Sequence, residues 1–181
     1  DCRIRGFICP PAYLLPMRLM LGMTGPRKKI QGMIVAGTVD SVGSGVTGFH
    51  KDERVFGMTG MNFGAHAEYA ILSAKNAAAR IPEGVDYESA AASIFGGTTA
   101  LYFLRKAGIK SGQKVLIHGA SGAVGTTAVQ LAVILGAVVT GVCSTVNLEL
   151  VESLGAARVV DYTKENIEES AWEFNIIFDA A

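Results

Sequence analysis

The pattern of hydrophobic and polar positions changes near residue 86. Beyond that point, short apolar runs alternate with stretches of helical periodicity, in the order strand, helix, strand, helix, strand, short helix, strand. We expect the strands at 114–118, 137–143, 158–161 and 175–179, and the two longer helices at 126–135 and 148–154. This alternation is typical of a parallel sheet with helical crossovers. The second half of the chain therefore predicts an α/β domain built on a doubly wound parallel sheet.

The first half of the chain consists of shorter, β-like runs that are separated by glycine. We expect strands within 31–46, 54–57 and 67–72. Strands at this spacing favour a small, irregular β-barrel or sandwich. The Ile-Pro-Glu-Gly sequence at 81–84 marks a turn, and a helix is expected over 87–107 with an interruption near Gly96 and Gly97.

Segment 115–125 carries the clearest functional signal, because its sequence VLIHGASGAVG joins an apolar strand to a helix through a glycine-rich turn. The dinucleotide-binding fingerprint is G-x-G-x-x-G in this context. Gly122 and Gly125 fill its second and third positions, where they allow close approach of a pyrophosphate and of the helix. We predict a cofactor site at Ala120, Ser121, Gly122, Ala123, Val124 and Gly125. A purely structural glycine turn is the alternative.

The end of the second strand bears on the choice of cofactor. A carboxylate there would bind the ribose hydroxyls of NAD, but this chain has Ser144, Thr145 and Asn147 after Cys143. These three side chains offer hydrogen bonds to a phosphate, which favours NADP over NAD, although no Arg or Lys is near in the sequence. They are equally suited to cap the next helix, and both roles are compatible.

Charge and cysteine usage mainly exclude classes of protein. The 16 basic residues balance the 16 acidic ones, and no face is rich in Lys and Arg, which argues against a nucleic-acid partner. No apolar run approaches the roughly 20 residues of a spanning helix, so no membrane partner is expected. Cys2, Cys9 and Cys143 are too scattered for a disulfide framework or a structural zinc site, a pattern that suits a reducing cytoplasm.

Nearly the whole chain resembles the zinc-independent medium-chain dehydrogenases/reductases, in their quinone oxidoreductase (zeta-crystallin-like) branch. The similar segments occur in the family's order and are 1–6, 32–37, 52–57, 67–69, 97–101, 120–125, 154–156 and 161–162. The resemblance implies a GroES-like catalytic domain at 1–86, without its N-terminal strands. It also implies an NAD(P)-binding Rossmann domain at 87–181, without its C-terminal half. We therefore expect a chain truncated at both ends, which begins with Asp1 rather than Met.

The resemblance also implies residue roles that composition and spacing do not. Thr99 would lie near the nicotinamide of NAD(P)H, and Ser144, Asn147 and Tyr162 would surround the adenosine phosphate. The implied reaction is hydride transfer from NADPH to a quinone, an enone or an aldehyde. No residue qualifies as an essential acid or base; Asp1, Arg5 and His66 are the candidates for the substrate side.

Zinc is not expected. Met33 stands where the zinc-dependent relatives have a histidine ligand, and a thioether is a poor zinc ligand. His50, His66 and His118 are not at metal spacing, and His118 is expected to pack in the core at the end of its strand. Two further positions depart from the family, because Ile34 replaces an acidic residue and no basic residue stands near Val146 or Asn147.

Two other functions remain open at this stage. One is a nucleotide-binding module without turnover, and the other is a structural or oligomeric protein. The long β-rich segment before the glycine turn and the lack of Tyr-x-x-x-Lys after it argue against a short-chain reductase. A half-built sheet would leave an unpaired edge, so we expect a homo-oligomer.

Overall fold

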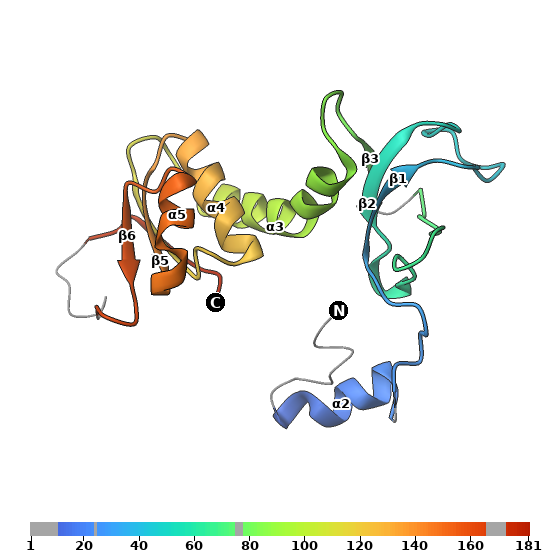
Figure 1. Ribbon diagram of the computed structural model, residues 1–181, viewed down its shortest axis with the longest axis horizontal. Coiled ribbons are helices and arrows are strands. Elements are labelled where there is room, and N and C mark those ends of the chain that lie inside the picture. Colours follow the sequence, from blue (N-terminus) through green and yellow to red (C-terminus); the bar gives the residue numbers. More distant parts are fainter. Residues whose placement is uncertain (1–10, 24, 75–77, 166–172) are drawn as a thin grey trace. The chain divides into compact units, whose positions relative to one another are not determined.

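The computed structural model describes residues 11–23, 25–74, 78–165 and 173–181 (Figure 1). It divides into two compact units, residues 1–94 and 95–181, whose boundary lies inside helix α3 (Tyr87–Lys106). The domain limits expected at 86 and 87 stay a prediction. Within the described residues, no helix is both long and apolar enough to span a membrane.

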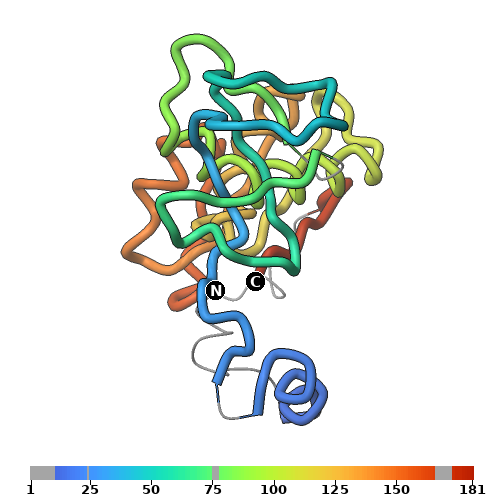
Figure 2. Tube along the Cα trace, turned by 90° about the vertical axis from the view of Figure 1, so that its right-hand side faces the viewer, coloured from blue at the N-terminus to red at the C-terminus, as the bar shows by residue number. Residues whose placement is uncertain are grey.

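The first unit is built on a three-stranded antiparallel sheet. Its strands are β1 (Ile34–Thr38), β2 (Arg54–Met58) and β3 (Ala78–Arg80), in the order β1-β2-β3. Phe56 in the central strand pairs with Ala36 on one side and Ala79 on the other. A helix, α2 (Pro11–Leu21), and a short 3-10 helix, η1 (Gly60–Asn62), complete the unit. Figure 2 shows α2 as the blue coil of the chain trace.

Two expectations for this unit were wrong. Residues 67–72 form no strand, and within 31–46 only β1 is extended in a sheet. Tyr69 and Ile71 in the first of these segments are 76% and 94% exposed, so its apolar side chains have no core face to bury. No element was predicted for the segment that forms helix α2, which contains Pro16, a residue that normally ends or bends a helix.

The second unit contains a four-stranded parallel sheet. Its strands are β4 (Lys114–His118), β5 (Val138–Cys143), β6 (Arg158–Asp161) and β7 (Ile176–Asp179). Their order in the sheet is β6-β5-β4-β7. Strands β5 and β6 are added in turn on one side of β4, and the chain then returns to place β7 on the other side of β4. Helices α4 (Ala123–Ile134) and α5 (Leu148–Ser153) connect them and lie beside the sheet (Figure 1). The α/β fold class with a Rossmann-like sheet is confirmed.

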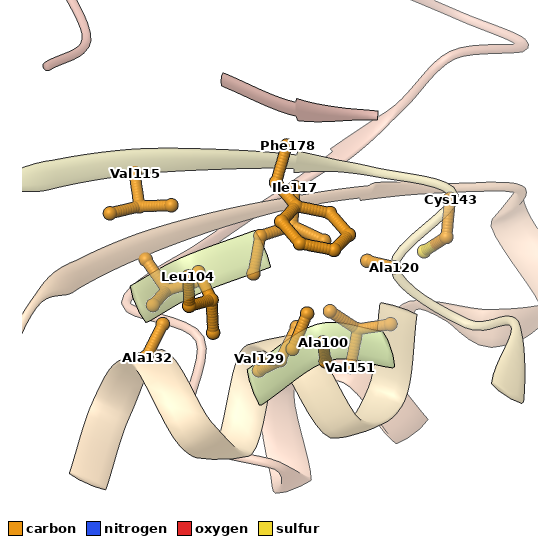
Figure 3. Packing of buried hydrophobic residues seen from close by; sticks show 12 residues of the cluster. Ala100, Leu104, Val115, Ile117, Ala120, Val129, Ala132, Cys143, Val151 and Phe178 are labelled. Atoms are coloured by element: carbon orange, nitrogen blue, oxygen red, sulfur yellow. The ribbon is translucent and has the colours of Figure 1, made fainter. Parts of the chain in front are cut away.

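The core of this unit lies between the sheet and its helices (Figure 3). Ile117 of β4, Leu104 of α3 and Val129 of α4 are all fully buried, and Phe178 of β7 joins them. Burial of each such side chain contributes roughly 1.5–3 kcal/mol. This packing holds the carboxyl ends of β4 and β5 in place, which is where the candidate site lies.

The helices of this unit differ from expectation at two points. Helix α3 runs without interruption through Gly96 and Gly97, although each glycine in a helix interior costs about 0.5–1 kcal/mol. A Cβ on Gly96 would lie 2.2 Å from the Ala123 carbonyl oxygen, so close packing against α4 requires glycine there. Helix α4 begins at Ala123 rather than at 126. The short helix expected between β6 and β7 falls mostly on 166–172, outside the described residues.

Candidate cofactor-binding site

The turn between β4 and α4 has the geometry of a phosphate-binding loop. The Ala120 amide donates to the Val142 carbonyl of β5 (2.9 Å), and the Gly122 amide donates to Gly119 (3.0 Å). Ala120 is fully buried, whereas Gly122 and Ala123 are exposed. Within the described residues, no side chain caps α4 at Gly122. The amides of the first turn of α4 therefore stand at an open surface, with the positive end of the helix dipole behind them.

The two fingerprint glycines have different roles. A Cβ on Gly125 would lie 2.1 Å from the Gly119 carbonyl oxygen, so the packing of α4 onto the turn excludes any side chain there. A Cβ on Gly122 would come no nearer than 3.4 Å to the same oxygen, which is ordinary contact. The space above Gly122 is therefore free for a ligand rather than filled by protein.

Thr99 lies half-buried in α3, one helical turn after Gly96. Because Gly96 packs against Ala123, that turn of α3 is held close to the start of α4. The structure therefore brings the Thr99 segment and the glycine loop together within the second unit.

Ser144 follows β5, and Thr145 and Asn147 lie in the next element, the 3-10 helix η2 (Thr145–Asn147). The Asn147 amide group donates to Ser144 Oγ (3.1 Å), which leaves the hydroxyl proton of Ser144 available to another acceptor. The Thr145 hydroxyl donates its one proton to Asp161 Oδ2, so towards a ligand it acts as an acceptor. No side chain caps η2 or α5 among the described residues, so the helix-capping role is not the one observed.

Asp161 is a buried carboxylate, 5% exposed, at the end of β6. The Thr163 amide (3.0 Å) and hydroxyl (2.7 Å) donate to its Oδ1, and Thr145 donates to its Oδ2. Hydrogen bonds from Thr145 and then from Thr163 lower the pKa of Asp161 from 3.8 to about 2. Lys164 Nζ lies 3.6 Å from the same Oδ2. The spacing of these residues in the sequence did not predict this cluster. It forms because Cys143 of β5 pairs with Asp161 of β6.

Tyr162 comes directly after β6, and its amide donates to the Cys143 carbonyl (3.2 Å). Its ring is exposed, at 56% of its full surface. The residues expected around the adenosine phosphate thus lie together where β5 and β6 end.

His118 and Asp179 form a pair that sequence reasoning did not identify. They are register partners at the ends of β4 and β7, and His118 Nδ1 lies 3.0 Å from Asp179 Oδ1. The His118 side chain is 43% exposed, so the expected packing in the core was wrong. The hydrogen bond from His118 is the largest cause of the lowered pKa of Asp179. The pair spans the point where strand order reverses, next to the glycine loop.

The substrate-side candidates are only partly described. Asp1 and Arg5 lie outside the described residues. His66 is exposed, and its amide donates to the Gln31 carbonyl (2.8 Å), which places it against Gly32 and next to Met33. Within the described ranges, no three His, Cys, Asp or Glu side chains are grouped in a way that suits a metal ion. Met33 itself offers only a thioether, which is a poor zinc ligand.

Known protein families match both parts of the chain. Residues 11–83 match the alcohol dehydrogenase GroES-like domain, and residues 123–181 match the zinc-binding dehydrogenase family. The chain is 37% identical over 164 residues to a 2-methylene-furan-3-one reductase of Solanum lycopersicum, which covers 86% of this chain and 42% of that protein.

Solved structures give the same result. The quinone oxidoreductase of Coxiella burnetii has a TM-score of 0.80 at 26% identity, covering 93% of this chain and 55% of that one. The Escherichia coli quinone oxidoreductase complexed with NADPH has a TM-score of 0.71 at 32% identity, covering 84% and 48%. The chain thus spans about half the length of the proteins it resembles.

Proposed function

We propose that this chain, which belongs to the medium-chain dehydrogenase/reductase family, binds NADPH and takes part in hydride transfer to a quinone, an enone or an aldehyde. The observation that carries the proposal is the exposed surface at Gly122, where a Cβ would meet only the Gly119 carbonyl oxygen among the described residues and no side chain caps the end of α4. A diphosphate is the ligand that suits this surface.

We assign one group of residues to each part of the cofactor. Residues 120–125 would hold the pyrophosphate, Thr99 would lie beside the nicotinamide, and Ser144, Asn147 and Tyr162 would hold the adenosine end. The lack of a carboxylate directly after β5 supports NADPH over NADH, as does the NADPH in the Escherichia coli relative.

When bound, NADPH supplies the hydride, and the protein contributes binding, orientation and a suitable electrostatic environment. We propose that the reaction proceeds without zinc. Polarisation of the substrate carbonyl then depends on hydrogen-bond donors of the protein and on positioning. His66 is the described candidate for such a contact on the substrate side.

One experiment tests binding and turnover separately. NADPH is titrated into the protein while nicotinamide or Trp172 fluorescence is followed, and 9,10-phenanthrenequinone is then added while the loss of NADPH absorbance is recorded. The proposal predicts saturable binding followed by oxidation. Absence of binding would contradict it.

Binding without oxidation would support a second candidate, a nucleotide-binding module without turnover. A structural role without nucleotide binding would instead show as a stable oligomer that leaves NADPH fluorescence unchanged.

We further propose that the protein forms a homo-oligomer and acts on a small molecule in the cytoplasm. Strand β7 pairs with β4 on one side, and its Ile177 is 68% exposed. An exposed apolar side chain of this size favours contact with a second chain. The buried, unpaired thiol of Cys143 suits a reducing compartment.

A further inference from the structure

The end of β5 presents hydrogen-bond donors to the adenosine end of the cofactor but no cation of its own. Ser144 and Asn147 are neutral, and Val146 between them is 87% exposed and apolar. A phosphomonoester carries a charge of about −1.5 to −2 at neutral pH and forms its strongest hydrogen bonds with charged donors. If NADPH binds here, its 2′-phosphate needs a cation from another element.

Lys164 supplies a cation at this edge from the turn after β6. Its Nζ atom lies 3.6 Å from Asp161 Oδ2, the same oxygen that accepts the hydrogen bond from Thr145 at the end of β5. The ammonium group and the β5 end are therefore linked through one carboxylate oxygen. Lys164 and Asn147 are 17 residues apart in the sequence, so the sequence alone does not show that Lys164 lies near the end of β5.

Lys164 is positioned by the carboxylate of Asp161, which is itself held by hydrogen bonds. Asp161 is buried and receives three hydrogen bonds from Thr145 and Thr163, and the Lys164 amide donates to the Asp161 carbonyl (3.0 Å). The Lys164 side chain is 65% exposed. Since an ammonium group has three donors, those not directed at Asp161 face solvent and are free to bind a second anion.

We propose that Lys164 is the residue that binds the 2′-phosphate and sets the preference of this chain for NADPH over NADH, with Asp161 as its positioning residue. This inference rests on the proposed function. Through Asp161 it places Lys164 near Thr145, at the carboxyl ends of β5 and β6, where the adenosine ribose of a dinucleotide binds. The cation expected near Val146 or Asn147 thus comes from the neighbouring strand.

An ordinary surface ion pair is the competing explanation for Lys164. In that case Lys164 would only neutralise Asp161, and its removal would affect NADPH and NADH binding equally. The two explanations differ in one measurable quantity, the ratio of the dissociation constants for NADPH and NADH.

We would measure both constants by fluorescence titration at two salt concentrations for the wild type, Lys164→Ala, Lys164→Arg and the control Lys110→Ala. Lys110 is an exposed lysine in the loop before β4, at the amino end of that strand, whereas Lys164 follows the carboxyl end of β6. We expect Lys164→Ala to weaken NADPH binding about tenfold, or about 1.4 kcal/mol, while NADH binding stays within about twofold. Lys164→Arg should retain the preference, Lys110→Ala should change nothing, and the salt dependence of NADPH binding should decrease only in Lys164→Ala.

The outcomes are distinguishable. An unchanged NADPH to NADH ratio in Lys164→Ala, in a protein whose wild type binds both, would overturn the role of Lys164 and leave the proposed function intact. A wild type that binds neither nucleotide would refute the proposed function, and this inference with it. An equal loss of both affinities would show that Lys164 supports the fold and does not read the phosphate.

Discussion

At the scale of single residues, Gly122 and Gly125 look alike in the sequence but differ in what surrounds them. The first borders open space, and the second is packed against the Gly119 carbonyl. Both were predicted, because the fingerprint is a local pattern in which strand, turn and helix follow one another in the sequence.

This difference predicts opposite effects of the same substitution. Gly122→Ala should leave the free energy of unfolding within about 0.5 kcal/mol of the wild type, because its Cβ makes an ordinary contact. It should weaken NADPH binding about tenfold or more, because the methyl group lies where the pyrophosphate approaches.

Gly125→Ala should instead destabilise the protein by about 1–3 kcal/mol, since the new methyl group would overlap the turn. Urea unfolding followed by circular dichroism measures the stabilities, and NADPH titration measures binding. Equal stability of the two variants would contradict the assigned roles.

The lowered pKa of Asp161 predicts how the stability of the protein depends on acidic pH. Its pKa in the folded protein is lowered to about 2 from 3.8, so the charged form is favoured by the fold. The stability that this provides is fully present above pH 3.8 and is lost as the pH falls through about 2.

Asp161→Asn should therefore be less stable than the wild type at neutral pH, and this difference should shrink between about pH 4 and pH 2. Urea unfolding across this range measures it, with Asp40→Asn in the exposed loop after β1 as the control. If the difference in stability between Asp161→Asn and the wild type did not depend on pH, the hydrogen bonds of Asp161 would not favour its charged form.

Residues that are brought together only by strand pairing could not be predicted. Lys164 and Asp161 lie near Thr145 because β6 pairs with β5, and His118 meets Asp179 because β7 pairs with β4. Spacing in the sequence carries no record of which strands are neighbours. His118 was misjudged for the same reason, since an isolated histidine at a strand end is usually a packed residue.

At the scale of elements, helix α3 shows how packing overrides local preference. Gly96 and Gly97 lower the helix propensity of the segment, which is why an interruption was expected. The packing of α3 and α4 in the second unit restores a continuous helix. The strands β4, β5, β6 and β7 were predicted to within one residue, because continuous apolar runs bounded by turns are typical of a buried parallel sheet.

The two glycines of α3 form a matched pair for a test. Gly96→Ala should destabilise the protein by about 1–3 kcal/mol, because its Cβ would lie 2.2 Å from the Ala123 carbonyl oxygen. Gly97→Ala meets no atom within 4 Å and should stabilise the helix by roughly 0.5–1 kcal/mol. Thermal and urea unfolding of both variants measure these effects. Similar shifts for both would contradict the close packing of α3 on α4.

At the scale of the whole molecule, the exposed face of β7 predicts self-association. Ile177→Lys places a charge at this exposed apolar position, and burying that charge against a second chain would be unfavourable. Size-exclusion chromatography with light scattering should show an oligomer for the wild type and a smaller species for Ile177→Lys. Lys110→Ala, which alters an exposed polar side chain in the loop before β4, serves as the control. A wild-type monomer would contradict the proposed assembly.

The strand order also determines when the sheet can form during synthesis. Strand β4 lies between β5 and β7, and its partners on the β7 side are 61 residues later in the chain, as for His118 and Asp179. While the ribosome makes those residues, β4 can pair with β5 on one side only. The amides and carbonyls on its other side are exposed to water. A newly made chain therefore carries an open β4 edge until β7 emerges, and a chaperone that shields strand edges would act on it during that interval.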